Sequence, residues 1–111
     1  MYKIQIILLF ILLSLGCNVQ AKTIVVCGSC AITSIKAAIA SAQECDTIRI
    51  KKGTYKEYNI LVDKPLTLIG EDFPVIDGED KGEIIRIVSD EVTIDGLFII
   101  NVGASYTSDY A

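Results

Sequence analysis

The sequence predicts an all-β fold, a right-handed parallel β-helix (solenoid) with one N-terminal amphipathic capping α-helix. The 111 residues are 51% hydrophobic and 22% charged, a composition typical of a chain with a packed core. Only one segment has a helical period, and beyond Asp46 short alternating strands are separated by glycines. Some of these strands repeat at an offset of 24 to 26 residues, which is the signature of a solenoid.

Residues 1–21 are expected to be a signal peptide. Residues 4–13 form an apolar run that is too short to span a bilayer comfortably but suits the hydrophobic region of such a peptide. Cleavage after Ala21 would leave a mature chain that is exported to the periplasm and contains no membrane span. The alternative is lipidation of Cys17, because the preceding Leu-Gly resembles the end of a bacterial lipobox. Ser14 weakens that alternative, since this position is usually Leu, Val or Ile.

Residues 22–45 are expected to form an N-terminal strand and a capping helix. The β-branched run at residues 22–26 predicts the strand. Residues 34–42 follow a helical period behind an N-cap signal, and their apolar face consists of Ile35, Ala38, Ile39 and Ala42. This helix should cover the open first coil of the solenoid and hide its apolar side chains and unpaired edge groups.

Residues 46–111 are expected to form the first coils of the β-helix. Residues 60–70 match residues 85–96 at an offset of 25 to 26, which predicts that Leu66 stacks near Val92 and Leu68 near Ile94.

The match between residues 75–77 and 99–101 continues this repeat at an offset of 24. Nothing in the sequence covers the last coil, so the chain is expected to be truncated, with the remaining coils supplied elsewhere. An antiparallel sandwich, in which the Asp-Gly pairs at residues 77–78 and 95–96 form hairpin turns, is the alternative fold.

The run from Asp46 to Ala111 resembles the N-terminal part of the NosD family. The strongest marks are Gly53-Thr54-Tyr55, Asp63-Lys64-Pro65-Leu66-Thr67-Leu68-Ile69-Gly70, Val75-Ile76-Asp77-Gly78 and Ser105-Tyr106-Thr107-Ser108-Asp109-Tyr110-Ala111. The resemblance implies an exported right-handed β-helix that assists copper-centre maturation of nitrous-oxide reductase. It also implies protein partners in the periplasm, namely an ABC transporter, a copper chaperone and the reductase.

The cysteines are the candidate metal ligands. Cys27 and Cys30 lie between the first strand and the helix, and Cys45 follows the helix. Soft thiolates suit Cu(I), and the two sulfurs of a Cys-x-x-Cys motif can meet one ion that a third thiolate completes. A structural disulfide between two of these three cysteines is equally plausible, because exported proteins commonly oxidise such pairs.

A carbohydrate-binding or polysaccharide-cleaving β-helix is the alternative function. It would use a cluster of carboxylates that lies beside two basic residues. The carboxylates are those of Asp77, Glu79, Asp80 and Glu83, and the basic residues are Lys81 and Arg86. Solvated turn chemistry explains the same residues more simply, so the protein is not expected to be an enzyme. Histidine is absent, which excludes a Ser-His-Asp triad within this chain, and the net charge of −4 argues against binding to nucleic acid.

Overall fold

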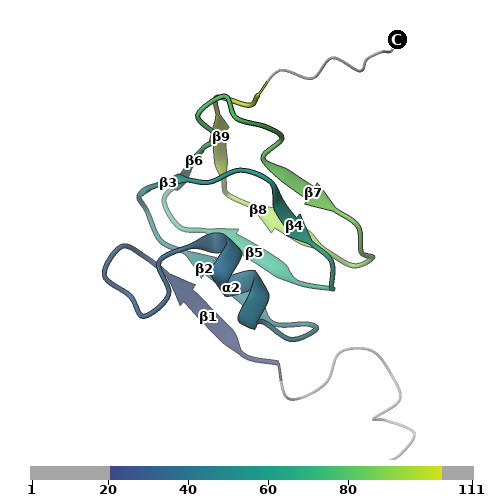
Figure 1. The fold of residues 1–111 in the computed structure, drawn as a ribbon. Helices are drawn as coiled ribbons and strands as arrows, with labels where there is room; N and C mark the ends of the chain where they lie inside the picture. The colour runs from purple at the N-terminus through teal and green to yellow at the C-terminus, as the bar shows by residue number, and fades with distance from the viewer. Residues whose placement is uncertain (1–20, 104–111) are drawn as a thin grey trace, which may run out of the picture.

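The computed structural model describes residues 21–103 and confirms the parallel β-helix (Figure 1). The short strands of this part wind through about three coils and form three sheets. Sheet A contains β1 (Thr23–Val26), β2 (Thr47–Ile50), β5 (Thr67–Gly70) and β8 (Thr93–Asp95). Sheet B contains β3 (Thr54–Lys56), β6 (Val75–Asp77) and β9 (Phe98–Ile100), and sheet C contains β4 (Ile60–Val62) and β7 (Ile85–Ile87).

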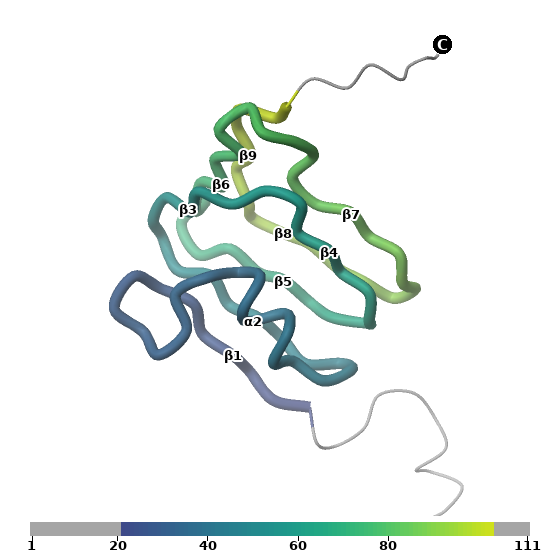
Figure 2. The backbone as a smooth tube through the Cα atoms, viewed as in Figure 1, coloured from purple at the N-terminus to yellow at the C-terminus, as the bar shows by residue number. Residues whose placement is uncertain are grey.

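Neighbouring strands within each sheet of the described chain are parallel, which excludes the antiparallel sandwich for this part. Each coil lies directly on the one before it, as the tube in Figure 2 shows. The predicted stacking of Leu68 on Ile94 is confirmed by the register of β5 and β8. Next to it, the Thr93 amide donates to the Leu66 carbonyl oxygen at 3.0 Å, so residues 66 and 92 face each other as the repeat predicts.

The predicted match between residues 75–77 and 99–101 is wrong by one residue. In the structure Val75 pairs with Phe98 and Ile76 with Ile99, an offset of 23. Because side chains alternate along a strand, the predicted register would have turned the apolar residues of β9 to the other face. The observed register keeps Ile99 over the fully buried Ile76.

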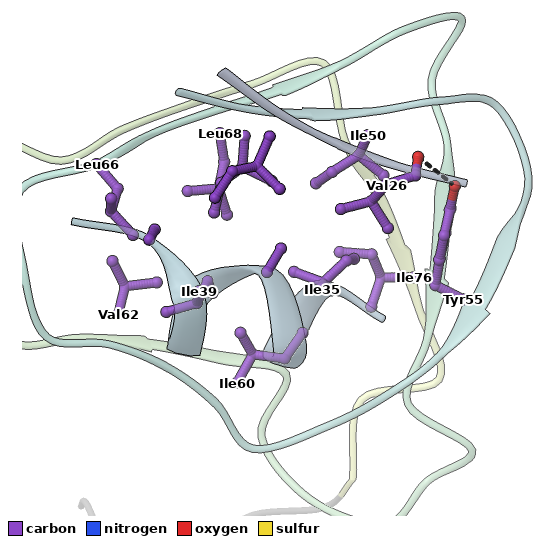
Figure 3. Packing of buried hydrophobic residues seen from close by; sticks show 14 of the residues in the cluster. Val26, Ile35, Ile39, Ile50, Tyr55, Ile60, Val62, Leu66, Leu68 and Ile76 are labelled. Carbon is purple, nitrogen blue, oxygen red and sulfur yellow. Dashed lines mark hydrogen bonds between the residues drawn. The ribbon is translucent and has the colours of Figure 1, made fainter. Parts of the chain in front are cut away.

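Apolar ladders run through the interior of the stack (Figure 3). The longest consists of Ile24, Ile48, Leu68 and Ile94, one residue from each strand of sheet A. The first three of these residues are buried, whereas Ile94 is half-buried because no described segment lies over the last coil. The alternate residues of β2 point outward, and Arg49 there pairs with Glu71.

Helix α2 (Ile35–Ser41) completes the first coil. It lies within the range that the sequence predicts, and Ser34 is its N-cap, with the Ser34 hydroxyl accepting from the Ala37 amide at 3.0 Å. The helix buries Ile35, Ala38 and Ile39 and packs against β1, β2 and β4. Sheet C begins only with β4, so α2 takes the place that a strand of the first coil would have in that sheet.

The predicted signal peptide up to residue 20, including Cys17, and the last eight residues lie outside the described part of the chain.

Candidate functional site

Cys27 and Cys30 lie in the loop that joins β1 to α2, and the structure joins them in a disulfide with an S–S distance of 2.03 Å. The Cys30 amide donates to the Cys27 carbonyl oxygen at 3.2 Å, which makes residues 27–30 a tight turn. The Cys27 amide donates to the carbonyl oxygen of Ile32 at 3.3 Å and ties the base of the loop to β1. The two cysteines are half-exposed, and the Gly28-Ser29 tip between them is exposed.

The structure does not bring Cys45 to this pair. Cys45 precedes β2 and its amide donates to the Pro65 carbonyl oxygen at 2.7 Å, at the end of sheet A where the strands begin. Cys27 follows β1 at the opposite end of the same sheet. The four-residue length of β1 therefore separates them, about 13 Å at the usual rise of a strand. Cys45 is also disulfide-bonded, and no cysteine of the described chain is a free thiol.

The cysteines in this oxidised form do not fit Cu(I), because a disulfide lacks the thiolate charge that makes cysteine a soft ligand. Within residues 21–103 no group of three His, Cys, Asp or Glu side chains is arranged to hold a metal ion. Only the reduced protein offers Cys27 and Cys30 as two adjacent thiolates on an exposed turn.

Asp77, from the carboxylate cluster, holds a turn together in the structure. Its Oδ1 accepts from Asn101 Nδ2 and from the Glu79 amide, both at 2.9 Å. These hydrogen bonds favour the charged carboxylate and lower the pKa of Asp77 below its usual value. A general acid needs the opposite shift, so this carboxylate is suited to stabilising the turn.

Four of the other charged residues of the cluster form two ion pairs, whereas Asp80 contributes its backbone amide to a hydrogen bond with the Asn101 carbonyl oxygen at 2.9 Å. Glu83 accepts from Arg86 Nε at 2.7 Å, which raises the pKa of Arg86, and Glu79 lies 3.4 Å from Lys81 Nζ. Both pairs lie at the surface.

A groove with a volume of about 430 Å³ runs beside the disulfide-bonded loop. One wall consists of Gly28, Thr33 and Ser34, and the other consists of residues 52–57, which include β3. The side chain of Tyr55 is buried under this second wall, where its hydroxyl donates to the Lys51 carbonyl oxygen at 2.6 Å. Burial and the nearby Glu57 carboxylate raise the pKa of Tyr55. Its ring is therefore part of the core and does not offer a face for a sugar.

Sequence reasoning missed three charged residues that hold the first coil in place. Asp46 is fully buried and accepts hydrogen bonds from Lys22 and Gln43. Glu57 binds the N-terminal end of α2, and Lys64 binds its C-terminal end. Except for the contact with Gln43, each of these contacts joins residues from neighbouring coils. The sequence pattern therefore gives no sign of these contacts.

The chain matches no protein-family model, no curated protein and no solved structure. Among residues 21–103, none of the helical structure has the length and apolar character that crossing a bilayer requires.

Proposed function

We propose that this protein is an exported scaffold that assists copper-centre maturation of nitrous-oxide reductase, with the sides of its β-helix serving as docking surfaces. The observation that carries the proposal is the parallel stack of coils, because three of the four segments that resemble the NosD family contribute strands to it. The segment from Asp63 to Gly70 contains β5, and the segment from Val75 to Gly78 contains β6. Strand β6 follows β5 in the same coil.

The geometry supports a binding role better than a catalytic one. The stack is held by backbone pairing and by ladders of apolar side chains, so its outer surface is presented on a rigid frame. Three of the four carboxylates that a polysaccharide-cleaving enzyme could use, those of Asp77, Glu79 and Glu83, form turn hydrogen bonds or surface ion pairs. The proposed partners are the periplasmic side of an ABC transporter, a copper chaperone and the reductase.

The proposal is tested in the host cell by deleting the gene and measuring copper in the purified reductase. We expect the reductase polypeptide to be exported in normal amount but to contain little copper, and expression of the gene from a plasmid to restore the metal. A reductase that keeps its full copper content after the deletion, or a host that contains no such reductase, would contradict the proposal.

Copper binding by the chain itself is a separate prediction. If the Cys27–Cys30 disulfide is reduced, the two thiolates are expected to bind about one Cu(I) per chain, because paired thiolates favour this ion. A competitive titration with a chromogenic Cu(I) chelator under anaerobic conditions measures the stoichiometry. The C27S/C30S variant should lose the site, and the oxidised protein is the matched control. Equal binding by the variant would show that Cys27 and Cys30 are not the copper ligands. The scaffold role would then be tested by the deletion experiment alone.

A further inference from the structure

Strand β3 has a free edge. It is the first strand of sheet B, with β6 on one side and no strand of the described chain on the other. The Val75 amide donates to the Gly53 carbonyl oxygen at 2.8 Å, and the Glu57 amide donates to the Asp77 carbonyl oxygen at 3.2 Å. Because alternate residues of a strand direct their backbone groups to opposite edges, the N–H and C=O groups of Thr54 and Lys56 face away from β6.

The groove lies along this free edge. In the first coil the place below β3 is taken by the disulfide-bonded loop, which contributes Gly28, Thr33 and Ser34 to the opposite wall. A side chain placed on Gly28 would meet no atom within 4 Å, so the mouth of the groove is open there. The volume of about 430 Å³ is within the usual range of ligand sites. The edge therefore faces a space into which another chain can enter.

The groove is positively charged although the chain as a whole carries a net charge of −4. Lys52 and Lys56 line it, and Lys51 is adjacent in sequence. These three lysines form no ion pair within residues 21–103, although Lys56 attracts the carboxylate of Asp77, its partner on β6. By contrast, Lys22, Arg49, Lys81 and Arg86 each form an ion pair. Glu57 also lines the groove, but its carboxylate oxygens accept from the Ile35 and Lys36 amides at the start of α2.

We propose that this groove binds an acidic peptide segment in an extended conformation, which adds to the edge of β3 as a further strand. The backbone groups of Thr54 and Lys56 would pair with the peptide backbone, and the Lys52 and Lys56 ammonium groups would meet its carboxylates. An acidic peptide fits better than a glycan because the free backbone groups of Thr54 and Lys56 repeat with the period of a strand. The aromatic residue that lines the groove, Tyr55, is buried and offers no ring face to a sugar. This peptide site is independent of the copper assignment and goes beyond the proposed scaffold role.

Isothermal titration calorimetry of the purified protein with an acetylated hexapeptide of alternating Asp and Val tests the proposal. We expect saturable binding that weakens about tenfold when Asn replaces each Asp, since each exposed ion pair contributes up to about 1 kcal/mol. The same acidic peptide with alternate backbone nitrogens methylated should not bind, because methylation removes the strand hydrogen bonds and keeps the charge. Polygalacturonate is titrated in parallel as an acidic glycan.

Two variants and one control locate the site. K52Q/K56Q should weaken binding about tenfold, by the same ion-pair arithmetic, and Lys81→Gln, which removes an exposed lysine outside the groove, should not change it. Thr54→Pro should abolish binding without breaking the β3–β6 ladder, because the Thr54 amide faces the free edge. Thermal denaturation checks that each variant is folded. If Thr54→Pro is not folded, the experiment with the methylated peptide tests whether the peptide binds by adding a strand.

Three results would overturn the proposal: no binding of the acidic peptide, equal binding of the methylated peptide, or binding of polygalacturonate in place of the peptide.

Discussion

Asp46 is the one fully buried charged side chain among residues 21–103. Its Oδ1 accepts from the Lys22 amide at 2.8 Å, and its Oδ2 accepts from Lys22 Nζ and from the Gln43 amide, each also at 2.8 Å. The carboxylate thus ties the residue before β1 to the turn before β2. If the signal peptide is cleaved after Ala21, the Lys22 nitrogen becomes a charged α-amino group and adds to this pairing.

The first prediction concerns stability at low pH. The Lys22 ammonium and the backbone amides lower the pKa of Asp46 from 3.8 to about 2. Since the folded pKa is depressed, the stabilisation is present above about pH 4 and is lost as the pH falls towards 2. Thermal denaturation between pH 6 and pH 2, values chosen to span that range, should show a falling melting temperature.

The Asp46→Asn variant distinguishes the contribution of Asp46 to this pH dependence from the contributions of the other carboxylates. It should lower the stability at pH 6 by roughly 1.5–3 kcal/mol, the usual contribution of a hydrogen bond to a charged group, and flatten the dependence on pH below 4. Asp63→Asn, an exposed carboxylate, is the control and should change neither quantity. A variant at position 46 with the same pH dependence as the parent protein would show that Asp46 is not the group responsible.

At the scale of the elements, α2 is held at both ends by residues that flank β4. Glu57 accepts from the Ile35 and Lys36 amides at 2.8 and 3.0 Å. Lys64 Nζ donates to the Ile39 and Ala42 carbonyl oxygens at 3.0 and 2.8 Å. Each charge has the sign that stabilises its end of the helix dipole. A helix of seven residues is too short to be stable alone, so these contacts add to its apolar packing.

We predict that Glu57→Gln and Lys64→Met each lower the free energy of unfolding by about 1 to 2 kcal/mol. Hydrogen exchange of the α2 amides should become faster in both variants, since losing either contact loosens one end of the helix. Urea denaturation measures the stability, and Lys51→Met, which removes a lysine that contacts neither end of the helix, is the control. Unchanged exchange in both variants would mean that apolar packing alone holds the helix.

The contrast between α2 and its contacts shows which features could be predicted from the sequence. The helix period and the N-cap signal at residues 33–34 predict α2 to within a residue of its start, because both signals lie within or next to the segment itself. Glu57 lies 22 residues from the Ile35 amide that it binds, so only the stacking of coils reveals the contact. The register of β6 and β9 could not be predicted for a related reason: the offset between paired residues falls from 26 for β5 and β8 to 23 for β6 and β9, so the chain turns this corner with three fewer residues in the last coil. Sequence similarity alone did not show that shortening.

For the candidate site, the closeness of Cys27 and Cys30 could be predicted from the sequence, whereas the position of Cys45 could not. The Cys-x-x-Cys spacing indicates that Cys27 and Cys30 are close in space, since only two residues separate them, and the structure has them as a disulfide. The spacing could not show that Cys45 lies at the other end of sheet A, because that depends on the direction of β1. The free edge of β3 likewise depends on how the coils stack, because a loop takes the place of a strand below β3 in the first coil.

At the scale of the whole molecule, the stack differs between its two ends. Helix α2 packs against β1, β2 and β4 at the first coil, whereas the last coil, formed by β8 and β9 after β7, has no described segment over it (Figure 1). Residues that point inward there are consequently more exposed than their partners below them. Ile99 is 41% exposed, whereas Ile76 beneath it is completely buried. Close backbone contact continues to this end, since a Cβ on Gly70 would collide with the carbonyl oxygen of Gly96.

This difference predicts a gradient of mutational cost along a single ladder. Leu68→Ala removes a completely buried side chain and should cost about 2 to 5 kcal/mol, whereas Ile94→Ala, one coil further on, should cost about half as much because its side chain already contacts solvent. Urea denaturation of the two variants measures both values, and Thr93→Ala, on the exposed face of β8, is the control. Equal costs for Leu68→Ala and Ile94→Ala would mean that another segment covers the last coil. In that case the exposed ladder ends would be an internal surface of a longer stack, and Ile99→Ala should then become as costly as Ile76→Ala.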